Sequence, residues 1–117
     1  MSISTRKVFL STVISLVLLL ALALPAAAQS RIIKGKVTDD KGQPAADVQI
    51  LIQGTDISRN LNTKTNKKGE YIYILGLQGG TYRVTARKAG FQPQVRENVK
   101  PTLTEEYVLD FQLAPGE

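Results

Sequence analysis

Paired carboxylates are the side chains of this sequence whose spacing comes closest to that of catalytic groups. The 117 residues include no His and no Cys, so a Ser–His or Cys–His nucleophile pair and a His-ligated zinc site cannot be assembled. Asp39–Asp40 and Glu105–Glu106 could in principle act as an acid and a base. Neighbouring residues on a strand point to opposite faces, however, so neither pair converges on one reacting atom. The inventory of side chains therefore disfavours an enzyme.

A calcium site is the second chemistry that the acidic residues suggest. Asp39, Asp40 and Asp47 supply the oxygen ligands that calcium prefers, but their spacing matches no recognised calcium loop. Asp39–Pro44 combines two aspartates, a glycine and a proline, which is typical of a turn in which an Asp side chain bonds the backbone. The sequence predicts a turn here, with no metal and no cofactor.

Cations are numerous in the second half of the chain, and two interpretations of them stay open. The residues concerned are Lys64, Lys67, Lys68, Arg83, Arg87 and Lys88. Arg83 and Arg87 fall on one face of an expected strand, where they could contact an anionic glycan or a membrane surface. Alternatively, these cations form a solvated face that discourages pairing with other molecules.

Exposed aromatic side chains, which sugar-binding sites and stacked nucleic acids usually need, are scarce. The chain has no Trp, and most of its Tyr and Phe residues fall at positions expected in the core. Tyr71 or Tyr73 could remain outside. A carbohydrate-binding module that uses Tyr73, Arg83, Arg87 and loop-end residues is therefore the alternative function. Nucleic-acid binding is disfavoured.

The N-terminal 28 residues are expected to be a helical signal peptide. Arg6 and Lys7 precede an almost unbroken apolar run, Val8–Leu24, and small residues follow it up to Ala28. This order predicts cleavage between Ala28 and Gln29, and an uncleaved membrane anchor is the alternative. No Cys follows the run, so a lipid-modified N-terminus is excluded.

Export of residues 29–117 follows from that prediction, to the periplasm, the outer envelope or the medium. Loss of Arg6 and Lys7 leaves 13 basic and 10 acidic residues, a net charge of +3, and no stable membrane span. The 89 residues amount to one small domain, which must be stabilised by packing because it has no disulfide.

Seven short runs of this domain are expected to be strands, most of them with alternating apolar residues and the third polar and ambiguous, and no window shows helical periodicity. The runs are Arg31–Thr38, Asp47–Gln53, Arg59–Thr65, Glu70–Leu75, Thr81–Ala86, Gln94–Val99 and Glu105–Leu113. The pattern predicts an all-β fold, an antiparallel Greek-key sandwich of about seven strands, with the polar third run at a sheet edge. The expected core residues are Val37, Val48, Ile50, Tyr82, Val84, Tyr107, Leu109 and Phe111.

Three finer expectations concern the centre and the end of the domain. Gly79–Gly80 predicts a tight hairpin or neighbouring pair formed by the two central runs. Val95, Glu97 and Val99 are expected to lie on one face. Glu105–Leu113 is expected to be a single strand.

An ordered set of motifs resembles the carboxypeptidase regulatory-like domain family across Ile32–Leu113. The opening Gly35–Asp39 and Gly42–Val48 is similar to the family's "G-x-V-x-D-x-x-G-x-P-x-x-x-x-V" pattern. The central family pattern is matched at Thr65, Gly69-Glu70-Tyr71, Leu77, Gly80-Thr81-Tyr82 and Gly90-Phe91. The span from Gly69 to Gly80 is about one residue longer than usual, which predicts a bulge within Ile72–Gly76. The sequence leaves open whether Tyr71 and Tyr73 or Ile72 and Ile74 point into the core.

The resemblance implies a transthyretin-like sandwich and a non-catalytic accessory module. Enzymes that share this fold, the hydroxyisourate hydrolases, depend on histidines, which this chain lacks. The expected partner is a protein or an envelope glycan. The residues that the resemblance marks as structural are Gly42, Gly69, Tyr71, Gly80, Tyr82, Gly90 and Phe91.

Overall fold

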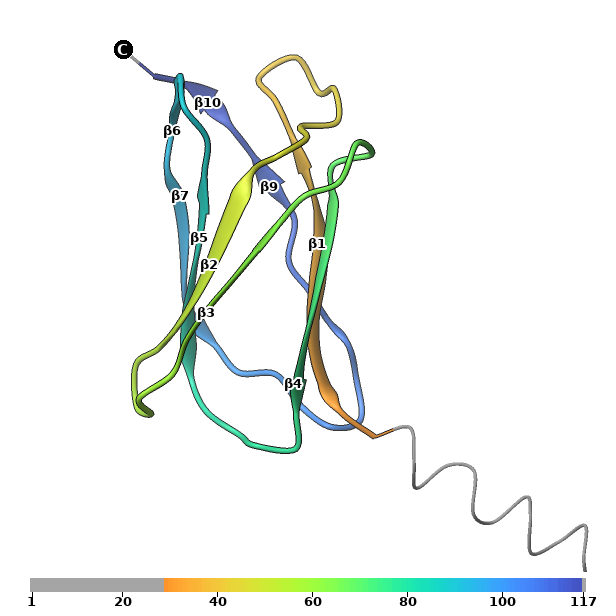
Figure 1. Ribbon diagram of the computed structural model, residues 1–117, viewed down its shortest axis with the longest axis vertical. Helices are drawn as coiled ribbons and strands as arrows, with labels where there is room; N and C mark the ends of the chain where they lie inside the picture. The colour runs from red at the N-terminus through yellow and green to blue at the C-terminus, as the bar shows by residue number, and fades with distance from the viewer. Residues whose placement is uncertain (1–28, 117) are drawn as a thin grey trace, which may run out of the picture.

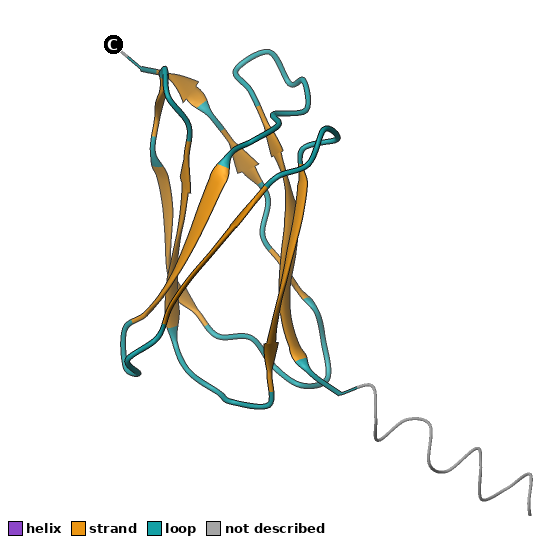
Figure 2. Cartoon of the chain, viewed as in Figure 1, coloured by secondary structure: helices purple, strands orange, loops and turns teal. Residues whose placement is uncertain are grey.

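Two β-sheets that face each other across one core make up the computed structural model, which describes residues 29–116 (Figures 1 and 2). The first sheet has the order β4-β1-β8, with β9 pairing farther along β1, and the second has the order β3-β2-β5-β7. The strands of the first sheet are β1 (Arg31–Thr38), β4 (Glu70–Gly76), β8 (Tyr107–Val108) and β9 (Phe111–Gln112). Those of the second are β2 (Gln49–Gly54), β3 (Asn60–Lys64), β5 (Tyr82–Arg87) and β7 (Gln94–Val99).

A small third sheet joins β6 (Phe91–Gln92) to β10 (Ala114–Pro115). Counted as interrupted strands, β6–β7 and β8–β10 bring the total to seven, so the all-β sandwich predicted from the sequence is confirmed. The polar strand β3 lies at a sheet edge, as expected.

The core is formed by the alternate residues that the strand pattern places inward. Val37, Val48, Ile50, Tyr82, Val84 and Phe111 are buried as expected, and Tyr107 and Leu109 pack against them while half-buried. The structure adds further buried side chains, among them Ile33, Ile52, Tyr71, Leu75, Val99 and Leu113.

The expected pairing of the two central runs is wrong. β4 pairs with β1 in the first sheet, whereas β5 pairs with β2 and β7 in the second. The chain between Gly76 and Tyr82 therefore crosses between the sheets. Hydrogen bonds fix the end of this crossing at Thr81: the Thr81 N–H donates to Asp56 Oδ1 at 2.8 Å, and the Thr81 carbonyl accepts from the Thr55 N–H at 2.9 Å. Burial of one face does not decide whether two strands share a sheet, because strands in opposite layers of a sandwich each bury one face as well.

The bulge expected within Ile72–Gly76 is present and fixes the open register. Arg31 pairs with Gly76 and Ile32 pairs with Ile74, so Leu75 is the extra residue. Tyr71 and Leu75 point into the core, Tyr73 is half-buried against it, and Ile72 and Ile74 point outward.

A second bulge, in β7, overturns the expected common face of Val95 and Val99. Tyr82 pairs with Val99 but Val84 pairs with Arg96, and Asn98 between them has a φ of 56°. Val99 is buried while Val95 is 44% exposed. Arg96 instead takes the position opposite the buried Val84, but it remains exposed, and its guanidinium lies 5.2 Å from the centre of the Phe111 ring.

The last predicted strand is interrupted, and it runs parallel to β1 rather than antiparallel. Ile33 pairs with Tyr107 and Val37 with Phe111, with a break at Leu109–Asp110. Within the break, the Leu109 N–H donates to the Lys34 carbonyl at 2.8 Å, and Asp110 Oδ1 accepts from the Lys36 N–H at 2.8 Å. These bonds substitute for regular ladder bonds, so the alternation of the run survives.

Candidate interaction surface

The outer face of the first sheet exposes three large apolar side chains close together. In β4, Ile72 and Ile74 point away from the core and are 55% and 62% exposed. Val108 in β8 is 59% exposed. Lys34 of β1 lies between Ile72 and Val108, because it pairs with both in the two ladders. We call this surface, Ile72, Ile74, Val108 and the β1 residues Ile32, Lys34 and Lys36 between them, the β1 face.

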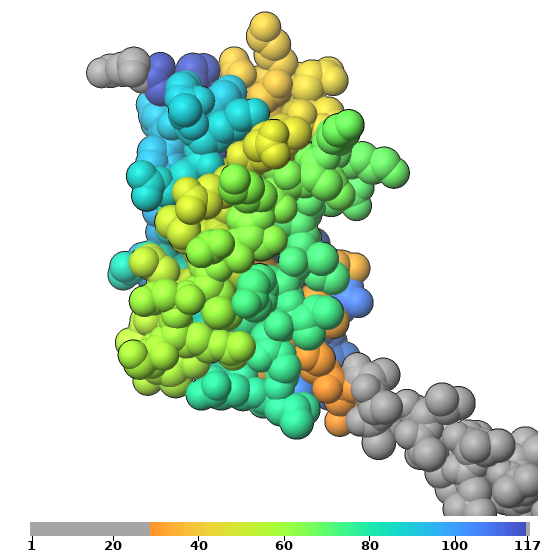
Figure 3. Space-filling model, in the orientation of Figure 1, coloured from red at the N-terminus to blue at the C-terminus, as the bar shows by residue number. Residues whose placement is uncertain are grey.

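Charged side chains lie within and beside the β1 face. Lys34 Nζ forms an ion pair with Glu106, and Lys36 pairs across the ladder with Glu70. In Figure 3 the atoms of β4 (green) lie at the surface beside those of β1 (orange). Exposed apolar side chains grouped on one face of a small domain, here with charged residues among them, are typical of an interaction patch.

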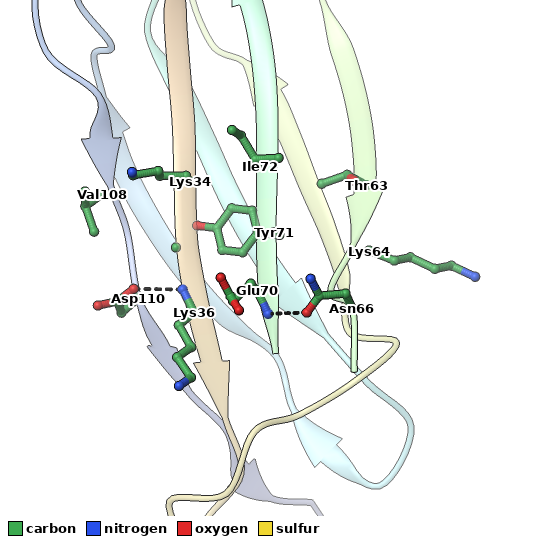
Figure 4. Close-up of a pocket in the computed structure, with 11 residues that line it drawn as sticks. Lys34, Lys36, Thr63, Lys64, Asn66, Glu70, Tyr71, Ile72, Val108 and Asp110 are labelled. Atoms are coloured by element: carbon green, nitrogen blue, oxygen red, sulfur yellow. Dashed lines mark hydrogen bonds between the residues drawn. The ribbon is translucent and has the colours of Figure 1, made fainter. Parts of the chain in front are cut away.

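A hollow of about 690 Å³ lies over one end of this face. It is lined by β1, β4, the C-terminal segment and the end of β3, and Figure 4 shows the side chains around it, including Lys36, Lys64, Asn66, Tyr71, Ile72 and Asp110. Asn66 Oδ1 accepts from the Glu70 N–H at 3.0 Å, which fixes the turn that forms one wall.

Tyr71 lies beneath the hollow and is committed to the fold. Its hydroxyl donates to the Leu109 carbonyl at 2.5 Å, and only 4% of the residue is exposed. Burial raises the pKa of Tyr71 well above its usual value, and the nearby Asp110 carboxylate raises that pKa further. The hydroxyl therefore stays protonated and acts as a donor, not as a base.

Asp39 accepts backbone hydrogen bonds within its own turn, as the turn pattern of Asp39–Pro44 predicts. Asp39 Oδ1 accepts hydrogen bonds from the backbone N–H groups of Lys41 and Gln43, both at 2.9 Å. Among residues 29–116, no three His, Cys, Asp or Glu side chains are arranged to hold a metal ion.

The surface residues singled out in the sequence do not form one site. Arg83 Nε lies 2.6 Å from Glu97 Oε1, and Arg87 lies about 13 Å farther along β5. Arg87 borders a separate hollow of about 370 Å³ together with Lys88, Phe91 and Pro93. Tyr73 is half-buried against the core, so it offers no open aromatic platform.

The residues marked as structural lie where turns and core need them. Gly42, Gly69, Gly80 and Gly90 all have positive φ, Tyr71 and Tyr82 are buried, and Phe91 packs against the core. At Gly69 a Cβ atom would lie 2.5 Å from the Val37 carbonyl oxygen, so this turn admits no side chain.

The β1 face itself was missed in the sequence. Its signal is the alternation Tyr71-Ile72-Tyr73-Ile74, which contains apolar residues on both faces of the strand. Only the register shows that the isoleucines are the exposed pair.

These features define a β-sandwich module with exposed apolar side chains on one sheet face, and comparison with known proteins identifies its family. The chain belongs to the carboxypeptidase regulatory-like domain family, whose model matches residues 32–114. It is 37% identical over 87 residues to carboxypeptidase D of Drosophila melanogaster, and the match covers 73% of this chain but 6% of that protein.

Solved structures agree on the transthyretin-like fold. The 5-hydroxyisourate hydrolase of Klebsiella pneumoniae superposes with a TM-score of 0.52 at 22% identity, covering 74% of this chain and 92% of the hydrolase. A Bacteroides uniformis protein described as carbohydrate-binding gives 0.58 at 18% identity, covering 74% of this chain and 42% of that one. No helix within residues 29–116 is long and apolar enough to cross a bilayer.

Proposed function

We propose that this protein is an exported, non-catalytic module that binds a protein partner through the β1 face. The observation that carries the proposal is the grouping of Ile72, Ile74 and Val108 on one sheet face. Each of these side chains is more than half exposed, and such groups on a small domain mark interaction sites. The family and the absence of His and Cys from the chain support a role that depends on contact.

The binding proposal is tested by placing a photo-crosslinking amino acid at Val108 in the full chain and irradiating the living host. Gln53, an exposed residue on the outer face of the second sheet, is the matched control. We expect discrete adducts with another envelope protein from position 108 and none from position 53. Equal adducts from both positions, or none from 108, would refute the assignment.

Export is tested separately. The leader pattern of residues 1–28 supports it, and we expect the protein recovered from the envelope or the medium to begin at Gln29. An intact N-terminus in the cytosolic fraction would contradict export. An intact N-terminus in the membrane fraction would establish the anchored alternative.

Glycan binding is a second candidate, favoured by the hollow beside Arg87. A cation, the amide of Gln49 and the half-buried ring of Phe91 meet there. An array of envelope polysaccharides distinguishes the two functions. Glycan retention that Arg87→Ala abolishes, and that Tyr73→Ala leaves intact, would support this candidate over the β1 face.

A further inference from the structure

The edge of β4 is an open strand edge with unusual composition. β4 is the terminal strand of its sheet, and beyond Glu70 it contains no charged residue and no proline through Leu77. Edges of this kind normally carry Lys, Pro or a cover, because unpaired backbone groups recruit other strands. β3 runs near β4 only at the turn that joins them and diverges from it beyond (Figure 1).

Within the part of the chain that the structure describes, the backbone groups that this edge leaves free belong to Ile72 and Ile74. The Lys34 carbonyl accepts from the Leu109 N–H, so Lys34 turns its backbone groups toward the C-terminal segment. Ile72 is opposite Lys34 in an antiparallel ladder, so its own N–H and C=O point the other way, outward from β1. Ile74 is two residues on and presents its N–H and C=O on the same side.

From this edge we infer that β4 pairs with β4 of a second copy of the chain, antiparallel, about a twofold axis at Tyr73. In this register Ile72 of each copy is opposite Ile74 of the other. These two pairs supply four backbone hydrogen bonds, and they use the groups that β1 leaves free. The four isoleucines then form one continuous apolar row on the outer face, and the half-buried Tyr73 rings meet on the axis.

Charge complementarity favours a second copy as the occupant. Glu70 lies at one end of the edge, and Arg59 lies at the other, with Nη1 3.1 Å from the Leu75 carbonyl oxygen. Antiparallel pairing brings each Glu70 toward Arg59 of the other copy. It leaves the bond from Arg59 to Leu75 intact, because pairing at Ile72 and Ile74 does not use that carbonyl.

The chain contains no Cys, so single cysteines report the register directly. Tyr73 and its symmetry mate would form a non-hydrogen-bonded pair with Cα atoms about 4.5 Å apart, within disulfide range. Two Ile72 residues would lie roughly 8–9 Å apart, beyond that range. We therefore expect oxidised Tyr73→Cys full-length protein to form a covalent dimer, and Ile72→Cys to stay uncrosslinked. An equimolar mixture of Ile72→Cys and Ile74→Cys should crosslink.

Sedimentation equilibrium of the cysteine-free protein provides the independent measurement. We expect a concentration-dependent dimer whose dissociation constant rises at least tenfold in Ile74→Lys, with an unchanged far-UV spectrum to show that the variant folds. A monomer at every concentration overturns the inference, as does equal crosslinking of Tyr73→Cys and Ile72→Cys. Crosslinking of Tyr73→Cys to a different polypeptide would also overturn it. Val108 lies on the opposite side of β1 from the β4 edge. The crosslinking experiment at Val108 therefore tests the protein-binding proposal separately from the dimer.

Discussion

The hydroxyl of Tyr71 in β4 donates a 2.5 Å hydrogen bond to the carbonyl of Leu109, in the break between β8 and β9. The bond spans β1, because the backbone N–H of the same residue, Leu109, donates to the Lys34 carbonyl of β1. A single side chain thus joins the outer two members of the first sheet at the point where regular pairing fails.

Tyr71→Phe should lower the free energy of unfolding by about 1.5 kcal/mol, since it removes this bond and leaves a carbonyl without its donor. Urea denaturation measures the loss. Tyr82→Phe is the matched control, because the Tyr82 hydroxyl is buried without a hydrogen-bond partner in residues 29–116. That variant should be within about 0.5 kcal/mol of the wild type or more stable. The interpretation fails if the two variants lose equal stability.

Alkaline pH should reduce the contribution of Tyr71. Burial raises the pKa of the Tyr71 hydroxyl in the folded protein above its ordinary value of 10.0, so Tyr71 loses its proton in the unfolded chain first. The contribution is complete below about pH 10 and declines as the pH rises beyond it. The difference in stability between wild type and Tyr71→Phe should therefore shrink above that pH in parallel urea titrations. A constant difference up to pH 11 would show that the raised pKa is incorrect.

Gly35→Ala should be among the most damaging small substitutions. A Cβ atom there would lie 1.9 Å from the Leu109 carbonyl oxygen, a backbone atom that cannot move without breaking the contact between β1 and the C-terminal segment. We expect a loss of about 3 kcal/mol. Gly42→Ala provides the comparison, since no atom of residues 29–116 lies within 4 Å of its added Cβ and its positive φ is what opposes the change. Thermal melts that show the smaller loss at Gly35 would contradict the close approach.

Thr65→Val should cost about 2 kcal/mol despite preserving shape. The buried Thr65 hydroxyl donates to the Ala45 carbonyl at 2.7 Å and accepts from the Val48 N–H at 3.0 Å, which ties the start of β2 to the end of β3. Thr63→Val, two residues earlier and within β3, is the control and should change stability little. Chemical denaturation of the pair tests whether the hydroxyl or the strand position matters.

The sequence predicts the strands better than their partners. Alternation places Val48, Ile50 and Phe111 inward correctly, because burial of one face is a local property of a strand. Pairing depends on distant segments instead. The double glycine at Gly79–Gly80 allows a hairpin and a crossover equally, and only the packing of β4 on β1 decides between them.

Bulges account for the other differences. One extra residue in β7 exchanges the faces of Val95 and Arg96. The only residue type that could have indicated this bulge is Asn98, because Asn tolerates positive φ. The bulge at Leu75 could be expected because the family's spacing is exceeded there. The β1 face could not be located from the sequence, because every position of Tyr71–Leu75 is apolar and the pattern does not show which side of the strand meets solvent.

Parallel pairing of β1 with the C-terminal segment has a consequence for the timing of folding. Lys36 and Asp110 are 74 positions apart, yet the bond between them helps to complete the middle of the first sheet. A chain that emerges N-terminus first from a ribosome or a translocation pore must leave one side of β1 unpaired until residues 107–112 have emerged. We therefore expect the first sheet to be completed late, only after the segment that holds β8 and β9 has been released.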